Sequence, residues 1–207
     1  MRLIIFGSTG SVGRLLVEQA LQDNHLVTAF LRDPHKLPIT HSNLRVVQGD
    51  VLDYKSVEKG IENQEVVICV LGAGAKGNVR AAGTKNIIRA MEKKGVKRLI
   101  CQSTLGIGDS RGNLNFFWKY IMFGMLLKQA YKDHEHQEKY VMESKLDWII
   151  VRPAAFTDGL RTGSYRHGFG PNEPGLTLKI SRADVADFIL QQVRNDTYLR
   201  KTAAQSY

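Results

Sequence analysis

Short apolar runs alternate along the chain with segments whose apolar residues recur at helical spacing. Each apolar run has the length of a short buried strand. The apolar runs occupy residues 3–6, 25–31, 44–50, 65–71, 97–104 and 146–153, and the helical segments lie near residues 15–21, 57–60, 79–94, 131–142 and 185–193. The alternation predicts an α/β fold in which a mainly parallel sheet carries helices on both faces.

A glycine-rich segment, Gly7-Ser8-Thr9-Gly10-Ser11-Val12-Gly13, joins the first apolar run to the first helical segment. Glycines let such a turn approach a pyrophosphate closely, and the helix that follows offers free N–H groups and a favourable dipole. The spacing is G-x-x-G-x-x-G rather than the commoner G-x-G-x-x-G, and the alternative is a turn with no ligand. Because of its position after an N-terminal strand, we expect a doubly wound Rossmann fold that binds a dinucleotide.

The end of the second predicted strand carries a positively charged residue, Arg32, with Lys36 close behind. In dinucleotide-binding folds an acidic residue at this place favours NAD, whereas an arginine accommodates the 2′-phosphate of NADP. Asp33 complicates the assignment, because it could instead cap the turn before Pro34. The alternative for Arg32 is a solvated surface charge. We favour NADP.

The third predicted strand ends at Asp50 and Val51, where a loop could close over an adenine with Asp50 as its polar partner. The alternative for Asp50 is a cap on the next helix. The fifth strand ends at Ser103 and Thr104, and ligands of open α/β sheets bind at this edge. A hydroxyl here could bind substrate or cofactor, or it could only satisfy nearby backbone groups.

The helical segment at 131–142 lacks the Tyr-x-x-x-Lys pair that serves alcohol-oxidising relatives of this fold as general acid and base. Glu135 follows Tyr131 by four residues, and Ser144 follows Tyr140 in the same way. This absence argues against ordinary alcohol or ketone chemistry. In the same segment, His134 and the histidine two residues later point to different helix faces, so no metal site is expected.

One domain is expected over residues 1–207, with substrate-side segments at about 106–130 and 157–175. Residues 116–127 form the most apolar stretch, which is shorter than the ~20 residues of a membrane span. We expect a helix packed over the mouth of the site or in the core, and the alternative is a membrane-surface contact. Residues 157–175 are glycine-rich and basic, and we interpret them as a mobile flap.

The formal net charge is +9, but the charge is spread along the chain and no nucleic-acid-binding motif accompanies it. An anionic cofactor and substrate explain the charge as well, so no nucleic-acid partner is expected. Cys69 and Cys101 lie in predicted buried strands, which indicates reduced core thiols in a cytoplasmic protein. Because Met1-Arg2 leads straight into the first predicted strand, we expect no signal peptide, and a monomer is the default expectation.

Taken together, these motifs resemble the atypical short-chain dehydrogenases/reductases of the NAD(P)H-binding (NmrA-like) group, which includes the flavin reductase/biliverdin IXβ reductase proteins. The resemblance covers nearly the whole chain. The matching stretches are residues 7–13, 31–33, 36–38, 49–52, 70–72, 101–103, 133–134, 151–153, 158 and 180–186.

The resemblance implies an NADPH site and an active-site serine, Ser103. The cofactor-binding residues that it implies, together with the glycine-turn residue Ser11, are Gly7, Thr9, Gly10, Val12, Arg32, Lys36, Asp50, Val51, Leu71, Gly72, Cys101, His134, Pro153 and Phe156. One departure is informative. The biliverdin reductase pattern carries a histidine shortly after the end of the sixth strand, and alanine stands there in this chain. This argues against histidine-assisted proton delivery.

The sequence therefore predicts an NADPH-dependent reductase that transfers hydride to a flat conjugated acceptor, namely FMN, FAD or a tetrapyrrole such as biliverdin. The alternative is a non-catalytic NADP(H)-sensing regulator of the NmrA-like type, in which the 116–127 stretch is exposed as a docking face. A reductase or isomerase that acts on another small molecule is a third hypothesis.

Overall fold

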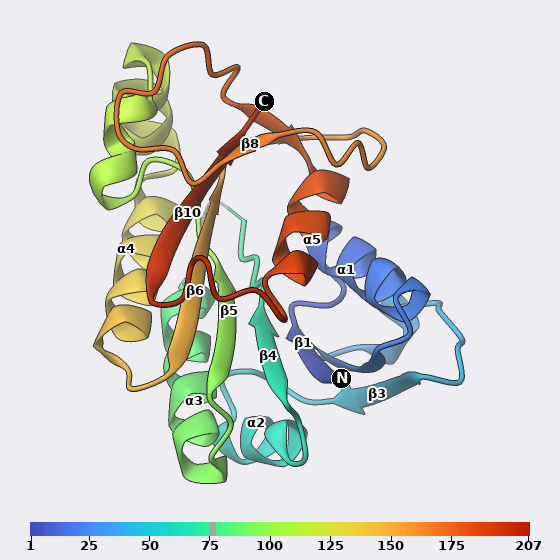
Figure 1. Cartoon of the computed structure of the whole chain (residues 1–207). Coiled ribbons are helices and arrows are strands. Elements are labelled where there is room, and N and C mark those ends of the chain that lie inside the picture. The colour runs from blue at the N-terminus through green and yellow to red at the C-terminus, as the bar shows by residue number, and fades with distance from the viewer. Residues whose placement is uncertain (75–77) are drawn as a thin grey trace.

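A computed structural model describes residues 1–74 and 78–207, and its centre is a single large sheet. Figure 1 shows the sheet edge-on with helices on both sides. The strand order is β3-β2-β1-β4-β5-β6-β10-β8, and the neighbours are parallel except β10 and β8. The strands are β1 (Arg2–Phe6), β2 (Leu26–Leu31), β3 (Leu44–Gln48), β4 (Val66–Cys69), β5 (Arg98–Gln102), β6 (Asp147–Pro153), β8 (Arg166–His167) and β10 (Lys201–Ser206).

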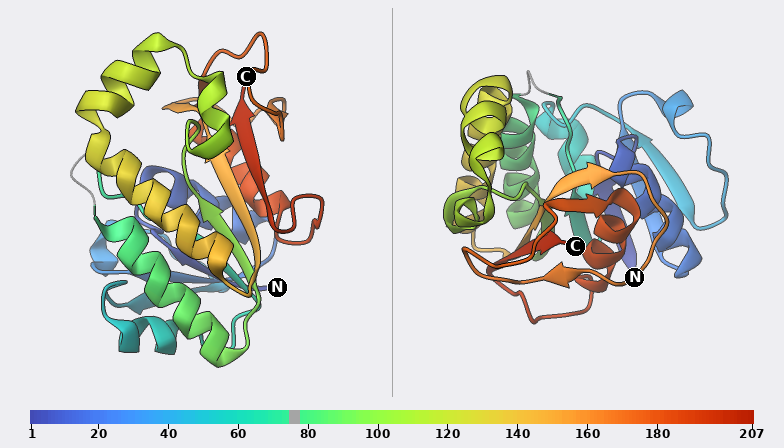
Figure 2. Two further views of the ribbon diagram at one scale, coloured as in Figure 1. Left: turned by 90° about the vertical axis from the view of Figure 1, so that its left-hand side faces the viewer. Right: turned by 90° about the horizontal axis from the view of Figure 1, so that it is seen from above.

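The helices form one layer on each face of the sheet, as Figure 2 shows from two further sides. Helix α1 packs against α5 on one face, while α3 packs against both α2 and α4 on the other. Their bounds are α1 (Ser11–Gln22), α2 (Tyr54–Ile61), α3 (Val79–Lys94), α4 (Lys128–Glu143) and α5 (Arg182–Gln191). The doubly wound Rossmann fold expected from the sequence is confirmed.

The alternation of side chains along each strand divides the core in two. Leu3 and Ile5 of β1 join the core beneath α1 and α5, whereas Ile4 and Phe6 join the core beneath α2, α3 and α4. All four side chains are fully buried. The central strands are therefore apolar at nearly every position, as parallel strands covered on both faces must be.

The order of the strands reverses between β1 and β4. The chain runs outward from β1 through β2 to β3, then returns to pair β4 with the free side of β1. A crevice opens at such a reversal, outside the carboxyl ends of the strands, because the two adjacent loops leave in opposite directions. The fold thus places such a crevice at the carboxyl ends of β1 and β4.

The chain between β6 and α5 follows the outside of the molecule. Strand β7 (Ala155–Thr157) pairs with β9 (Lys179–Ser181) in a small separate sheet. Between them, the expected flap is held to α5 by hydrogen bonds: the backbone N–H groups of Thr162 and Gly163 donate to Asp184 Oδ1 at 2.7 and 2.9 Å. These bonds anchor the flap beside the cleft.

The most apolar stretch forms η3 (Phe117–Leu126), a helix with π-type hydrogen bonds. Its only buried residue is Phe123, which is 8 % exposed, and several of its large apolar side chains face outward. The sequence predicts a helix packed over the mouth of the site or in the core. One side of η3 packs in this way, around Phe123, whereas the other side is exposed.

A buried ion pair joins α4 to the sheet. Arg152 Nε and Nη2 donate to the two carboxylate oxygens of Glu138 at 2.9 and 2.6 Å, and the two side chains are 4 % and 3 % exposed. A third bond links Arg152 to Asp109 at 2.5 Å. This fork geometry fixes the position of α4 along β6.

Replacing Glu138 with glutamine removes one charge of this pair and leaves the Arg152 guanidinium buried without full compensation. We expect the Glu138→Gln variant to lose about 3 kcal/mol of unfolding free energy in urea denaturation. The control is Glu135→Gln, an exposed position on the same helix, which should change the unfolding free energy by less than about 0.5 kcal/mol. Equal stabilities of the two variants would contradict the role of the pair.

Candidate functional site

The glycine turn after β1 is shaped by close backbone contacts. Gly7 has a φ of +89°, and a Cβ on it would collide with the carbonyl oxygen of Val70 at the end of β4. A Cβ on Gly13 would likewise collide with the Gly7 carbonyl oxygen. Glycine is therefore required at both positions, because no other residue lets the turn lie this close to β4.

The turn presents the N-terminus of α1 to the cleft. Gly10 is the N-cap residue; no side chain caps it in the described structure, and the first turn holds no acidic residue. The amide hydrogens of Ser11 and Val12 belong to this first helical turn and have no partner within the helix. An uncapped helix N-terminus with glycines in front of it fits a phosphate group.

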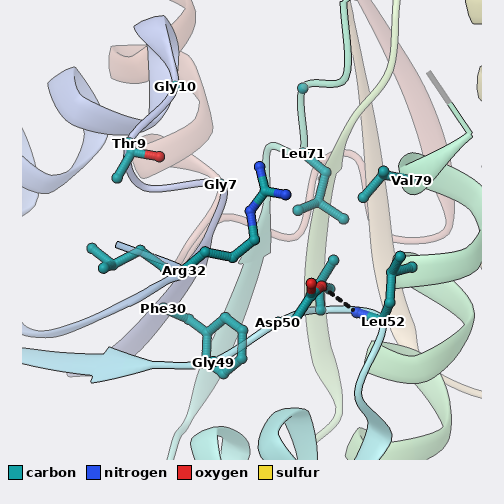
Figure 3. A pocket seen from close by; sticks show the side chains of 13 residues that line it. Gly7, Thr9, Gly10, Phe30, Arg32, Gly49, Asp50, Leu52, Leu71 and Val79 are labelled. Carbon is teal, nitrogen blue, oxygen red and sulfur yellow. Dashed lines mark hydrogen bonds between the residues drawn. The ribbon is translucent and has the colours of Figure 1, made fainter. Parts of the chain in front are cut away.

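A first pocket of about 180 Å³ lies beside the turn, between the ends of β1, β2 and β4 (Figure 3). The side chain of Arg32 extends over it from the end of β2. Its lining residues are Gly7, Thr9, Gly10, Phe30, Leu31, Arg32, Gly49, Asp50, Val51, Leu52, Leu71, Gly72 and Val79. Eight of the sequence-predicted cofactor residues meet here, so the pocket has the composition expected for the adenosine end of a dinucleotide.

Asp33 and Asp50, each of which could have been a cap, take different roles in the structure. Asp33 Oδ1 accepts a hydrogen bond from the His35 backbone N–H at 3.1 Å, so it caps the short turn η1 (Pro34–Lys36), as the alternative proposed. Asp50 does not cap α2, because Asp53 does so by accepting from Lys55 N–H at 3.1 Å. That alternative for Asp50 is wrong. Its carboxylate instead accepts from Leu52 N–H at 2.9 Å and stays at the pocket wall (Figure 3).

A second pocket of about 200 Å³ continues from the first and shares Gly10, Leu71 and Gly72 with it. Its other lining residues are Ser11, Val12, Val70, Arg80, Gln102, Ser103, Thr104, His134, Ala154, Ala155 and Phe156. Three buried polar atoms that line it, Arg80 Nε, Gln102 Oε1 and Ser103 Oγ, have no hydrogen-bond partner in the described structure. Buried polar atoms are rarely left unpaired, so this pocket is built for a polar ligand.

Ser103 decides between the two interpretations of the strand-end hydroxyl. Its backbone N–H donates to the Val151 carbonyl at 2.7 Å, but its Oγ, in a residue only 2 % exposed, bonds to no described backbone group. The hydroxyl therefore does not serve to satisfy nearby backbone. The neighbouring Thr104 hydroxyl differs, because it donates to the Leu105 carbonyl at 3.4 Å.

His134 is held neutral and in one tautomer. Burial lowers its pKa to about 3, and the positive charge of Arg80 acts in the same direction. The Gln137 amide donates to Thr84 Oγ1 at 3.0 Å, which directs its oxygen toward His134 Nδ1 at 3.2 Å. Nδ1 therefore carries the hydrogen, and Nε2 is left as an acceptor. His134 can accept a hydrogen bond from a ligand but cannot supply a proton near neutral pH.

Arg80 brings the one positive charge among the described lining residues of the second pocket. It is 8 % exposed, and among the described residues its guanidinium makes one long polar contact, 3.5 Å, with Asp133 Oδ2. Asp133 is already engaged, since its two oxygens accept the backbone N–H groups of Arg80 and Ala81 at 3.1 and 3.0 Å. Most of the guanidinium donors are therefore available to a ligand.

Three sequence-predicted residues do not line either pocket. Lys36 is exposed beyond the first pocket, and its carbonyl accepts from Arg14 at 3.0 Å. Cys101 is buried opposite Cys69 in the pairing of β4 with β5, and both thiols are free. Pro153 lines a smaller cavity beneath η3.

Two polar residues of the second pocket escaped the sequence analysis. Gln102 immediately precedes Ser103, and its buried amide could have been noticed as a polar residue inside an apolar strand. Arg80 lies in the first turn of α3, directly after a glycine-containing loop. A charge in the first turn after a strand-end loop is the signal that could have found it.

Comparison with known proteins identifies the family. A sequence model of NAD(P)H-binding proteins matches residues 7–196. The chain belongs to the NAD(P)H-binding family. Curated relatives include the photosystem II assembly factor Ycf39 of Synechocystis, 27 % identical over 98 % of this chain and 61 % of the relative. The UPF0659 protein YMR090W of Saccharomyces cerevisiae is 26 % identical, and the match covers 93 % of this chain and 87 % of that protein. This chain thus spans about three fifths of Ycf39.

Solved structures agree with the family and the fold. The oxidoreductase YlbE of Lactococcus lactis is 26 % identical with a TM-score of 0.85, covering 100 % of this chain and 90 % of its own. ChuY, an anaerobillin reductase of Escherichia coli O157:H7, is 25 % identical with a TM-score of 0.84, covering 100 % and 97 %. The resemblance to atypical short-chain dehydrogenases/reductases is confirmed.

Two further features are absent from residues 1–74 and 78–207. No group of three or more histidine, cysteine or acidic side chains there is placed to hold a metal ion. In the same residues, no helix has the length and apolar character needed to cross a bilayer.

The neutral state of His134 makes stability depend on pH. The unfolded chain binds a proton below the ordinary histidine pKa of 6.5, whereas the folded protein does so only near 3, so folding stability falls as the pH falls between these values. Between pH 7.5 and 5, we expect wild type to lose about 2 kcal/mol more unfolding free energy than the His134→Gln variant. The control is His136→Gln, on the exposed side of α4, which should follow wild type. Parallel pH profiles of wild type and His134→Gln would contradict the buried neutral state.

Proposed function

We propose that this protein is an NADPH-dependent reductase that transfers hydride to a flat conjugated acceptor, either a flavin or a tetrapyrrole such as biliverdin. One observation carries the proposal: the second pocket offers polar groups that bind and orient a ligand, but none of its described groups releases a proton near neutral pH. Hydride supplied by bound NADPH would pass to a ligand in this pocket. The acceptor must therefore be one that needs no dedicated protein acid.

The chemistry of conjugated acceptors fits this requirement. A ketone needs a general acid whose pKa lies near the working pH, because its oxygen gains negative charge as hydride arrives. A flavin or a tetrapyrrole spreads that charge over a large ring system, and solvent can supply the proton. Ser103 would then donate a hydrogen bond to an acceptor carbonyl, and His134 Nε2 would accept one from a ribose hydroxyl or a ring N–H.

The walls of the pocket favour a flat, anionic ligand. Ala154 and Ala155 leave space beside the strand ends, and the Phe156 ring, 37 % exposed, offers a face for stacking. Arg182 lies over that ring at 5.5 Å and pairs with Asp158 at 2.6 Å, which holds the ring in place. Arg80 would bind an acidic group of the acceptor. ChuY, an anaerobillin reductase of similar structure, supports an acceptor of this shape.

The adenosine end of the cleft favours NADPH over NADH. Arg32 lies over the first pocket, and Asp33, which would favour NADH, is turned away to cap η1. Among the described residues Arg32 forms no ion pair, so its charge is available to a 2′-phosphate.

A second candidate is an NADP(H)-sensing regulator without turnover. The outward apolar face of η3 favours it, because the sequence hypothesis for a regulator requires such a face to be exposed. The assembly role in the name of Ycf39 points the same way, although this chain covers only 61 % of that protein. Turnover separates the two functions.

The decisive measurement is NADPH oxidation by the purified protein with FMN, FAD and biliverdin as separate acceptors, with a simple ketone as the negative control. We expect oxidation with at least one conjugated acceptor and none with the ketone. The Ser103→Ala variant should lower kcat about tenfold without changing NADPH affinity, because one orienting hydrogen bond is lost. Thr104→Val is the matched control and should change kcat less, since that hydroxyl already bonds to Leu105. If the protein binds NADPH but none of the acceptors oxidises it, the reductase hypothesis is wrong and the regulator hypothesis is favoured.

Cofactor preference tests the adenosine end separately from turnover. Replacing Arg32 with aspartate removes the phosphate partner and adds a repulsive charge, so the ratio of NADPH to NADH affinity should fall about 100-fold in fluorescence titrations. Lys36→Asp is the control, because Lys36 lies outside the pocket lining and should alter the ratio less than about tenfold. An unchanged ratio in Arg32→Asp would remove this residue from the site.

A further inference from the structure

Helix η3 divides an almost continuous apolar run between two faces. On the inner face, Trp118 and Phe123 lie with ring centroids 5.8 Å apart, and Phe123 contacts Tyr131 at 5.2 Å. Trp118 and Phe123 line a small cavity together with Leu105 and Leu114. The inner face thus accounts for packing, and the outer face needs another explanation.

The outer face of η3 is a concentrated apolar surface. Six of the twelve exposed large apolar side chains in the described residues belong to this helix and the residue before it. They are Phe116, Phe117, Tyr120, Ile121, Met125 and Leu126, and they are 71, 50, 56, 38, 73 and 64 % exposed. They recur at steps of four and five residues, the spacing of one side of a π-type helix. Single exposed apolar residues are ordinary, but a contiguous group of this size marks a binding surface.

The segment that carries this surface has basic residues but no acidic residue of its own. No acidic residue occurs between Asp109 and Asp133, while four basic residues do: Arg111, Lys119, Lys128 and Lys132. Asp133 itself is buried against Arg80, so its charge does not offset them. Aromatic and aliphatic side chains next to unopposed lysines are typical of helices that lie in the interface of an anionic membrane.

We propose that the outer face of η3 docks on an anionic lipid surface, with the helix lying in the interface rather than spanning it. The positive charge favours this occupant over a second copy of the chain. A symmetric dimer would bring the four basic residues of each copy against those of the other, and juxtaposed like charges oppose association.

Docking here would orient the cleft. The cavity beneath η3 shares Thr104, Ala154 and Ala155 with the second pocket, so the helix stands next to the acceptor end of the cleft. Figure 2 shows η3 beyond the end of α4, at the rim of the molecule. A membrane on the outer face of η3 would therefore lie beside the second pocket and away from the amino edge of the sheet.

The test is co-sedimentation of the full-length protein with vesicles of phosphatidylcholine alone or with about one third phosphatidylglycerol, at low and high salt. We expect binding only to the anionic vesicles, weakened by salt. Lys128→Glu/Lys132→Glu should lower the partition coefficient at least about 25-fold, since each basic residue near such a surface contributes about fivefold. Phe116→Ser/Met125→Ser should lower it at least about tenfold.

Matched controls carry the same changes elsewhere. Leu160→Ser replaces a side chain that is 87 % exposed outside the surface, and Lys55→Glu/Lys59→Glu reverses two charges on α2; both should bind vesicles like wild type. NADPH affinity and thermal melting confirm the fold of every variant. Equal binding to neutral and anionic vesicles, no binding to either, or wild-type binding by both Lys128→Glu/Lys132→Glu and Phe116→Ser/Met125→Ser would overturn the proposal. A dimer that is lost in Phe116→Ser/Met125→Ser would overturn the proposal in favour of a second copy of the chain. Binding of an acidic protein to this surface, without vesicle binding, would overturn it in favour of that protein.

Discussion

The cleft depends on one close approach of backbone to backbone. Gly7 lies so near the carbonyl of Val70 that any side chain would collide with it, and Gly13 lies equally near Gly7. With glycine at both positions, the turn after β1 can lie directly against the end of β4, where the strand order reverses. The N-terminus of α1 consequently points along the carboxyl edge, and both pockets open from the same turn. The position of the turn therefore sets where a ligand would lie relative to Arg32 at one end and Ser103 at the other.

The second pocket is held by polar interactions that the sheet alone does not dictate. The Arg152–Glu138 pair sets α4 along β6, and His134 stands one helical turn before Glu138 on the same side of α4. Gln137 then fixes the imidazole through Thr84 of α3. As a result, the neutral imidazole of His134 lies near the guanidinium of Arg80, most of whose donors have no partner in the described structure. Such a pair orients a ligand strongly yet cannot deliver a proton at neutral pH, which explains why the absence of a tyrosine–lysine pair does not preclude a reductase of conjugated rings.

Local patterns predicted those features that depend on neighbours in sequence. The parallel sheet follows from apolar runs such as residues 66–69, and the end of α3 follows from Gly95, which has a φ of +72°. The glycine turn and Ser103 were found because strand ends meet at one edge. Contacts between distant segments were not predictable: Arg80 meets Asp133 across 53 residues, and Cys101 turns toward Cys69 instead of the cleft. The sequence predicted a packed helix for the apolar stretch at 116–127, but apolar character alone does not show how many faces of a helix are buried.

The positive charge of the chain acquires meaning only in three dimensions. Along the sequence it is dispersed and gives no motif, yet the fold brings separate members to three places at which we propose that anions bind. Arg32 lies over the first pocket, Arg80 lies in the second pocket, and the segment that contains η3 carries four basic residues and no acidic residue between Asp109 and Asp133. The first two are single side chains set among buried walls, which suits the small, localised charges of a phosphate or a carboxylate. The third is a group of exposed side chains around an apolar surface, which suits a broad, diffuse charge. One composition thus serves two kinds of anion, and burial decides which kind each residue can bind.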